Sequence, residues 1–323
     1  MAIVVAMKAA GGCDQLEVAE VGIPEPGPGE IRIRQIAIGV NFIDIYHRSG
    51  LYPVPSLPAV LGVEGAGIIT AVGPGVADLR PGERVCYAGA LGAYASERLL
   101  PAWRAVLVPP EISDAVAATA LSRGITAQML TARVFPVAHG TVALVHSAAG
   151  GLGTLLVKWA KRRGAIVIGT VGSPAKAIVA KKAGADHVIV GRDADFAQEV
   201  ASLTGKHGAD VAYDGVGGAT LLKTFDCVRP FGVVASIGQT AGPTPPISVE
   251  ELGPRRSIML ARPSVMRYMS DPDSYRRAAA DVIAMLQAGI QQDVGQEYPL
   301  TQAASSHADL EAGRTTGCLV LMP

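Results

Sequence analysis

The order of apolar and polar residues along the first third of the chain predicts short strands. Residues 30–36 alternate between polar and apolar side chains, as a strand with one buried face does, and residues 67–72 form an apolar run. Proline–glycine clusters at residues 26–29 and 73–75 separate these segments. Short strands joined by tight turns are typical of an antiparallel sheet, so we predict a compact, mostly antiparallel β domain.

The pattern changes near residue 112, where an alanine-rich helical segment begins. From residue 141 onward, apolar runs of strand length alternate with helical segments, which predicts a doubly wound parallel sheet. The predicted strands span residues 141–147, 165–170, 187–190, 210–214, 232–238 and 257–261.

A helix over residues 274–288 and a strand over residues 317–322 follow this alternation. We expect them to return to the first domain. The chain is thus predicted to be an α/β protein in which residues 123–264 are inserted into a β domain made of residues 1–122 and 265–323.

The most informative single stretch follows the strand at residues 141–147. Ala148, Gly150 and Gly153 occupy the three positions of the G-x-G-x-x-G fingerprint, with alanine at the first, and a helical apolar face follows at once. Such a strand–turn–helix presents backbone N–H groups and a positive helix end to a dinucleotide pyrophosphate. The alternative is a tight turn without a ligand. The predicted cofactor contacts in the turn are Ala149, Gly150, Gly151, Leu152 and Gly153.

The residues after the second strand of this domain favour NADPH over NADH. An NAD site normally places Asp or Glu there, to bind the ribose hydroxyl groups, but residues 154–185 contain neither. Ser173 and Lys176 follow the strand instead, and Arg192 comes after the next one. A hydroxyl and two cations suit a 2′-phosphate. Ser173 is also a candidate helix cap, with Pro174 at the first helical position.

Composition narrows the function classes. The 323 residues suffice for two domains, 49% of them are hydrophobic and 17% are charged, and the formal net charge is zero. The chain also has no run of five Lys or Arg residues. With the zero net charge, this leads us to expect no nucleic-acid partner. No apolar stretch is long enough to span a membrane, and the first ten residues lack the basic segment of a signal peptide. Four cysteines far apart, without a C-x-x-C pair, indicate a reducing, cytoplasmic setting.

Two longer motifs carry a family resemblance. Residues 41–53 read NFIDIYHRSGLYP and residues 57–67 read LPAVLGVEGAG, and the glycine turn, the DGVG at residues 214–217 and the TTG at residues 315–317 accompany them. With these motifs the chain resembles the zinc-independent, zeta-crystallin-like quinone oxidoreductases of the medium-chain dehydrogenase/reductase superfamily. The resemblance covers nearly the whole chain. It implies a GroES-like catalytic domain, an inserted Rossmann domain and an active site in the cleft between them.

The same superfamily contains zinc alcohol dehydrogenases, and two expected zinc ligands are missing here. Those enzymes carry Cys where this chain has Asn41 and His where it has Val63. Only Cys86 lies in the stretch that holds their four structural-zinc cysteines. A zinc site needs three or four ligands, so we predict no metal. Glu64, the remaining candidate ligand, is then expected to be a structural carboxylate.

The resemblance also implies site residues. Asn41, Tyr46 and Tyr52 would line the substrate pocket, although Asn41 is also a candidate for fixing a turn and Tyr52 for packing on neighbouring prolines. Asp44 is expected to order this loop or contact the cofactor, and Arg262 to reach the site or form a surface ion pair. His146 is expected to pack in the core. The further implied cofactor contacts are Thr126, Gly238 and Gln239 near the nicotinamide, Val216 and Gly217 at the ribose, and Arg314 at the phosphate end.

The function implied is reduction of quinones by hydride transfer from NADPH, without metal or flavin. Two alternatives stay open: an enone or enoyl reductase, which acts on activated C=C bonds, and an NADPH-binding protein without useful turnover. A homodimer, or a dimer of dimers, is also expected, because the strands over residues 232–238 and 257–261 would leave an apolar sheet edge exposed in a monomer.

Overall fold

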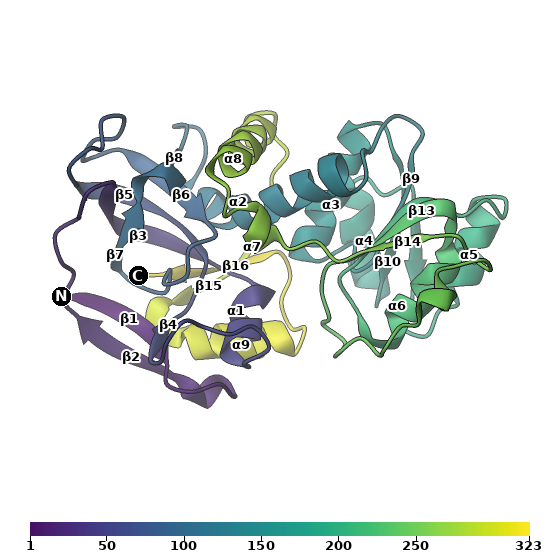
Figure 1. Cartoon of the computed structure of the whole chain (residues 1–323), viewed down its shortest axis with the longest axis horizontal. Helices are drawn as coiled ribbons and strands as arrows, with labels where there is room; N and C mark the ends of the chain where they lie inside the picture. Colours follow the sequence, from purple (N-terminus) through teal and green to yellow (C-terminus); the bar gives the residue numbers. More distant parts are fainter. The chain divides into compact units, whose positions relative to one another are not determined.

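The computed structural model describes residues 1–323, which fall into two compact units. The first unit contains Met1–Ile125 and Met266–Pro323, and the second contains Thr126–Val265. Figure 1 shows the helices and strands of both units coloured along the chain.

The first unit is built on a seven-stranded sheet. Its strands are β3 (Glu30–Val40), β5 (Glu64–Val72), β6 (Arg84–Ala88), β7 (Glu97–Pro101), β8 (Val106–Leu107), β15 (Val294–Pro299) and β16 (Cys318–Met322). The order is β15-β16-β3-β5-β6-β8, with β7 also paired to β3, and only β15 and β16 run parallel. The end of the chain therefore pairs with β3, near its beginning. A smaller antiparallel sheet has the order β2-β1-β4, made of β1 (Ala2–Met7), β2 (Leu16–Val21) and β4 (Ala59–Val60).

Strand β3 explains how the period-two pattern maps onto this sheet. Ile31 and Ile33 are fully buried on one face, as the alternation predicts. The strand continues to Val40, beyond the predicted residue 36, because the sheet is covered on both faces there. Gln35 is buried as well, and its amide nitrogen donates to the carbonyls of Ala93 and Ala95, both at 2.6 Å. The alternation of buried and exposed side chains along β3 therefore ends where both faces of the strand are buried.

Helices complete the first unit. They are α1 (Phe42–Arg48), α2 (Asp114–Met129), α7 (Val265–Tyr268), α8 (Pro272–Gln287) and α9 (Ala303–Glu311). Helix α8 corresponds to the helix predicted over residues 274–288. It is fixed to the sheet by Tyr275, whose hydroxyl donates to the Arg104 carbonyl at 2.8 Å and accepts from the Ala88 N–H at 3.1 Å. Helix α1 lies where the sequence suggested a loop, and α9 and β15 were not predicted.

The second unit confirms the predicted doubly wound sheet. Its strands are β9 (Val142–Val145), β10 (Ile166–Val171), β11 (His187–Val190), β12 (Ala209–Asp214), β13 (Val228–Ser236) and β14 (Met259–Ala261). Every neighbouring pair is parallel, in the order β11-β10-β9-β12-β13-β14. Counted along the chain this is 3-2-1-4-5-6, the Rossmann order, whose switch point lies between β9 and β12.

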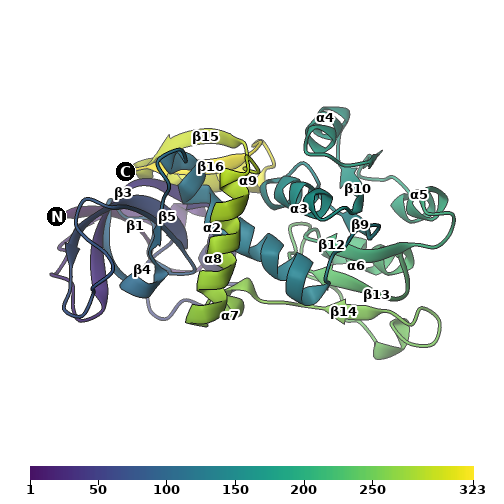
Figure 2. The same ribbon diagram turned by 90° about the horizontal axis from the view of Figure 1, so that it is seen from above.

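Four helices connect these strands: α3 (Gly151–Arg162), α4 (Pro174–Lys182), α5 (Phe196–Leu203) and α6 (Gly218–Thr224). Helices α3 and α4 pack on each other and on β9, β10 and β11, whereas α6 packs on β12 and β13 (Figures 1 and 2). The core beneath them is apolar and includes Leu144, Ile168, Ala212 and Phe225. Dinucleotides bind at the carboxyl ends of such strands, near the switch point.

Two strands of this unit are shorter than the apolar runs that predicted them. Strand β9 stops at Val145, because the chain turns at Ser147, whose φ of 53° lies in the left-handed region. Strand β14 starts at Met259 rather than at residue 257, and Ser257 has a φ of 52°. The sequence pattern that predicted the strands did not mark these two turns.

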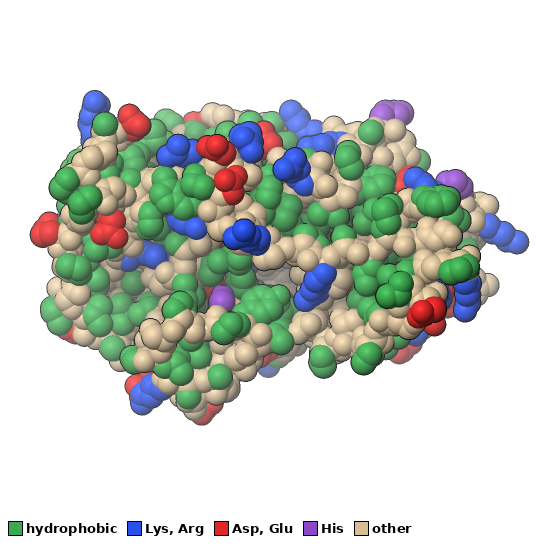
Figure 3. Space-filling model, viewed as in Figure 1, with side chains coloured by type: hydrophobic (Ala, Val, Ile, Leu, Met, Phe, Trp, Pro, Cys, Tyr) green, Lys and Arg blue, Asp and Glu red, His purple; other side chains and the backbone are tan.

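The surface carries charges of both signs. On the face drawn in Figure 3, basic and acidic side chains are scattered among apolar ones, with no broad surface of a single sign. This distribution agrees with the zero net charge. None of the helices is long and apolar enough to span a membrane.

Candidate functional site

The glycine turn is held between three neighbouring segments. The Ala148 N–H donates to the Thr170 carbonyl at 3.0 Å, and the Gly150 N–H donates to the Ser147 carbonyl at 2.8 Å. A Cβ on Gly153 would lie 2.1 Å from the Ser147 oxygen, so only glycine lets α3 pack this closely on the turn. Gly150 is the N-cap of α3 and has no side-chain cap. The first N–H groups of this helix are therefore suited to hold a pyrophosphate, with Ala149, Gly151 and Leu152 in the same turn.

Helix α4 begins directly after β10, and the side chain of Arg192 lies close to the same point. Ser173 is the N-cap of α4, where its hydroxyl accepts from the Lys176 N–H at 3.4 Å, and Pro174 follows it. The predicted capping role is confirmed. Arg192 lies over Gly172, since a Cβ built on that glycine would be 3.6 Å from the Cγ and Nε atoms of Arg192.

Gly191 directs the chain into this arrangement. Its φ of 126° lies in the region that L side chains rarely adopt. The structure explains the glycine here by backbone conformation, because the turn from β11 into Arg192 would be strained with any side chain.

A second turn forms at the ends of β12 and β13. The Asp214 carboxylate accepts the N–H groups of Val216 at 2.8 Å and Gly217 at 2.9 Å. Gly217 has a φ of 72°, and a Cβ on it would lie 2.7 Å from the Cα atom of Gln239. A Cβ on Gly238 would lie 2.6 Å from the Gly215 carbonyl oxygen. Four of the predicted cofactor residues thus come together here.

Arg262 extends this turn. Its guanidinium donates to the Ser236 hydroxyl at 2.9 Å and approaches the Gly238 carbonyl at 3.4 Å. Thr126, also expected near the nicotinamide, is half-buried in α2. Arg314 lies in the first unit, where it is exposed and its guanidinium Nε donates to the Asp309 carboxylate at 2.9 Å. Its predicted cofactor contact stays a prediction.

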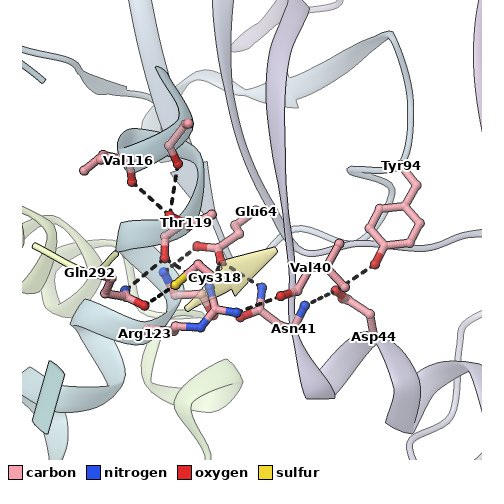
Figure 4. Close-up of polar contacts among 12 residues, drawn as sticks. Val40, Asn41, Asp44, Glu64, Tyr94, Val116, Thr119, Arg123, Gln292 and Cys318 are labelled. Atoms are coloured by element: carbon pink, nitrogen blue, oxygen red, sulfur yellow. Dashed lines mark hydrogen bonds and ion pairs between the residues drawn. The ribbon is translucent and has the colours of Figure 1, made fainter. Parts of the chain in front are cut away.

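The first unit fixes Asn41 at the start of α1 (Figure 4). The Asn41 amide nitrogen donates to Glu64 at 2.7 Å, which leaves one N–H of the amide for another partner. Glu64 is fully buried; it also accepts from the Ser122 N–H at 2.9 Å and pairs with Arg123 at 3.4 Å. Burial raises the pKa of Glu64, and Arg123 and Asn41 oppose that shift.

This cluster does not offer a zinc-ligand set. The guanidinium of Arg123 provides the positive charge beside Glu64, and the Asn41 amide nitrogen is already engaged. Arg123 is itself held by the Val40 carbonyl, at 2.7 Å. No three His, Cys, Asp or Glu side chains come together so as to hold a metal ion. Glu64 has the structural role that the sequence suggested.

A buried chain of hydrogen bonds leads from Asn41 toward the surface. The Asp44 Oδ2 atom accepts from the Asn41 N–H at 2.8 Å and lies 3.1 Å from the Tyr94 hydroxyl, which in turn lies 2.8 Å from His307 Nε2. His307 Nδ1 lies 3.3 Å from a guanidinium nitrogen of Arg48. Arg48 also pairs with Glu311 at 2.7 Å. Nothing in the sequence marked this chain, because its members lie far apart.

Arginine fixes the direction of these bonds. A guanidinium has only donors, so His307 Nδ1 must accept, and the neutral ring then carries its proton on Nε2. That proton goes to the Tyr94 oxygen, and the Tyr94 hydroxyl donates to Asp44. Burial, together with the charge of Arg48, lowers the pKa of His307 to about 3, which keeps the ring neutral.

Asp44 is fully buried and receives both of its hydrogen bonds on one oxygen. The other oxygen, Oδ1, has no partner. Burial raises the pKa of Asp44 to about 7, against the hydrogen bonds from Asn41 and Tyr94. Asp44 therefore orders the start of α1, as predicted from the family. A contact with the cofactor stays a prediction.

Tyr46 and Tyr52 form an aromatic pair beside Asn41 in the chain. Their ring centroids are 5.3 Å apart at an interplanar angle of 65°, and the Tyr52 N–H donates to the Tyr46 carbonyl at 3.0 Å. His47 supports the pair with Nδ1 lying 3.3 Å from the Tyr52 carbonyl. Both tyrosines are half-buried. They present apolar ring faces with polar tips, which suits a flat ligand bearing carbonyl groups.

Two stretches of the chain match known domain families. Residues 27–110 match the alcohol dehydrogenase GroES-like domain, and residues 151–284 match the domain described as zinc-binding dehydrogenase. The chain is 41% identical to the 2-haloacrylate reductase of a Burkholderia species over 322 residues, covering 97% of this chain and 96% of that protein.

The chain is also 39% identical to the quinone oxidoreductase of Pseudomonas aeruginosa, covering 97% of each protein. The crystal structure of the Escherichia coli quinone oxidoreductase complexed with NADPH superimposes with a TM-score of 0.96, at 37% identity. It covers 99% of this chain and 100% of that one.

The raised pKa of Asp44 predicts a pH-dependent stability. The folded-state pKa is above the unfolded value of about 4, so the folded carboxyl keeps its proton where the unfolded one loses it. Stability from this group is full below about pH 4 and is lost as pH rises through 7. Asp44→Asn keeps both accepted hydrogen bonds without a charge. We expect its free energy of unfolding to rise relative to wild type from pH 4 to 8, by a few kcal/mol, in urea denaturation.

The control is Asp78→Asn, in the same unit, where the carboxyl is exposed to water in the folded state as well. A constant difference between Asp44→Asn and wild type across this pH range would contradict the prediction. The comparison cancels the other titrating groups of the unit, because they are common to both proteins.

Proposed function

The chain belongs to the quinone oxidoreductases of the medium-chain dehydrogenase/reductase superfamily, and we propose that it reduces quinones with NADPH. The observation that carries this proposal is the end of β10, where Ser173, Lys176 and Arg192 replace the acidic residue of an NAD site. NADPH supplies the hydride from its nicotinamide ring. The protein supplies binding, orientation and hydrogen bonds.

We propose that the second unit holds the cofactor. The uncapped N-terminus of α3 would bind the pyrophosphate, and Ser173, Lys176 and Arg192, which follow β10 and β11, would bind the 2′-phosphate. The turns after β12 and β13 bind the ribose and the nicotinamide. The residues assigned are Ala149, Gly150, Gly151, Leu152, Gly153, Ser173, Lys176, Arg192, Val216, Gly217, Gly238, Gln239 and Thr126, with Asn41, Asp44 and Arg314 from the first unit.

Asn41, Tyr46 and Tyr52 are proposed to bind the substrate. The free N–H of the Asn41 amide donates to a substrate oxygen as negative charge develops there, and its orientation is fixed in advance by Glu64. The tyrosine pair holds a flat ring through its apolar faces. A quinone is already electrophilic, so the protein has mainly to position it and exclude water.

A second candidate reaction is reduction of an activated C=C bond. It is favoured by the similarity to a 2-haloacrylate reductase and by the paired phenol rings of Tyr46 and Tyr52. Hydride addition to such a bond requires a proton on the neighbouring carbon, and a phenol can supply it. Quinone reduction depends less on such a donor.

The first test is consumption of NADPH, followed by absorbance, with a quinone and with an α,β-unsaturated ketone, in the presence of a chelator. We expect turnover of the quinone, and less than about threefold loss of kcat in Tyr46→Phe and Tyr52→Phe. A hydroxyl that donates a proton would be worth about 100-fold or more. A loss of that size on the enone alone would support the C=C reductase. Tight NADPH binding without turnover would contradict both reactions, and dependence on zinc would contradict the metal-free assignment.

Cofactor selectivity provides a separate prediction. Lys176→Ala should raise the KM for NADPH by about tenfold or more and leave that for NADH within about twofold, because only NADPH carries the 2′-phosphate. Lys182→Ala is the matched control, since Lys182 is exposed at the other end of α4. Equal effects of Lys176→Ala on the two cofactors would remove Lys176 from the phosphate site.

We also propose that the protein is a homodimer joined at the β14 edge of the parallel sheet. The edge strand exposes Met259 (52%), and Phe231 of the neighbouring β13 is 74% exposed where its N–H donates to the carbonyl of Ser257, just before β14, at 2.7 Å. Exposed apolar sheet edges are usually covered. The cysteines are all unpaired, which is in keeping with the proposed cytoplasmic location.

The mass in solution tests the assembly. The wild-type protein at micromolar concentration should have the mass of a dimer, or of a dimer of dimers, by light scattering. Phe231→Glu combined with Met259→Glu should reduce it to that of a monomer, because like charges would meet across the edge. Ile178→Glu, an equally exposed apolar position on α4, should leave the mass unchanged. A monomeric wild-type protein would refute the proposed dimer.

A further inference from the structure

A buried polar chain lies directly beneath the three turns assigned to the cofactor. His146 follows β9 and is only 4% exposed. Its Nδ1 atom lies 2.9 Å from the Thr170 hydroxyl in β10, and its Nε2 atom lies 2.9 Å from the Thr224 hydroxyl at the end of α6. The Thr224 hydroxyl lies 2.9 Å from the Asp214 carboxylate at the end of β12. The four side chains therefore link β10, β9, α6 and β12.

The direction of these hydrogen bonds follows from the number of protons available. The Thr224 hydroxyl has one proton and two oxygen acceptors, the Asp214 carboxylate and the Thr220 carbonyl, each at 2.9 Å. The carboxylate is the strongest acceptor in reach, so the proton goes to Asp214, Thr224 accepts from His146, and Nε2 of His146 carries the proton. Nδ1 then accepts from the Thr170 hydroxyl. Burial lowers the pKa of His146, against the charge of Asp214, and this direction favours the neutral ring that the arrangement requires.

Each end of the chain reaches a turn of the cofactor site. Asp214 binds the N–H groups of Val216 and Gly217 with its other oxygen. Thr170 lies next to the end of β10, three residues before Ser173, and its carbonyl accepts the Ala148 N–H at 3.0 Å. His146 immediately precedes Ser147, which begins the glycine turn with its left-handed φ of 53°.

We propose that His146 and Thr224 are positioning residues for NADPH, a role that rests on the proposed function. Neither His146 nor Thr224 is among the residues assigned to contact the cofactor. They set the spacing of the three turns by a chain of hydrogen bonds that all donate toward Asp214. The bonds from His146 to Thr224 and from Thr224 to Asp214 are buried, where water does not compete with them, so the turns are held in the binding geometry before the cofactor arrives.

Thr224→Val tests the proposal, because it keeps the shape of the side chain and removes only the hydroxyl. We expect the Kd for NADPH, from fluorescence titration without substrate, to rise about tenfold. Thr224→Ser, which keeps the hydroxyl and removes the methyl group, should restore the Kd to within about twofold of wild type. Thr131→Val is the matched control: Thr131 is fully buried in the same unit, and its hydroxyl bonds only to the Ala127 carbonyl, at 2.7 Å.

A purely structural role would lower the thermal stability of Thr224→Val and Thr131→Val alike and leave both Kd values unchanged, and that result would overturn the proposal. If Thr224→Val does not fold, Thr170→Val breaks the other, half-buried end of the chain and should raise the Kd in the same direction; an unchanged Kd there would also overturn it. A wild-type protein that binds no NADPH would overturn the proposed function itself.

Discussion

A carboxylate that is entirely removed from water determines the arrangement of the first unit. Glu64 lies at the start of β5 with no exposed surface, and the cost of burying it is offset only by the donors around it. These donors come from two places in the chain: the amide of Asn41 before α1, and, in α2, the backbone N–H of Ser122 together with the guanidinium of Arg123. Satisfying Glu64 thus fixes the end of β3, the start of α1 and the position of α2, and with them the aromatic pair proposed to bind the substrate.

The parts of the fold that were predictable from the sequence are those with a local signal. The doubly wound sheet follows from alternating apolar runs, and the cap at Ser173 follows from its neighbours Pro174 and Lys176. Helix α1 has a local start signal in Asn41 and Asp44, but its seven residues are too few to show a helical period. The site is different in kind. Tyr94, which donates to Asp44, lies 50 residues away from it in sequence, and the partners of His146 lie on a separate strand and helix, so only tertiary structure brings them together.

The two units divide the requirements of the proposed reaction between them. The second unit supplies backbone N–H groups, cations and turns, which are the features that bind a dinucleotide. The first supplies aromatic surface and an oriented amide, which are the features that bind a flat electrophile. Neither set contains a strong acid or base aimed at the substrate, and hydride transfer to a quinone does not demand one.

The same pattern of hydrogen bonds occurs in both units, and it affects how the protein takes up protons. In each unit a neutral histidine, His146 or His307, passes a hydrogen bond toward an aspartate that binds backbone N–H groups at the edge of a site. Burial lowers the pKa of both rings, and that of His47 as well. Burial thus favours the neutral form in three of the six histidines. On mild acidification these three rings gain less positive charge than imidazoles in water would, and in the two hydrogen-bonded chains the neutral rings act as fixed dipoles.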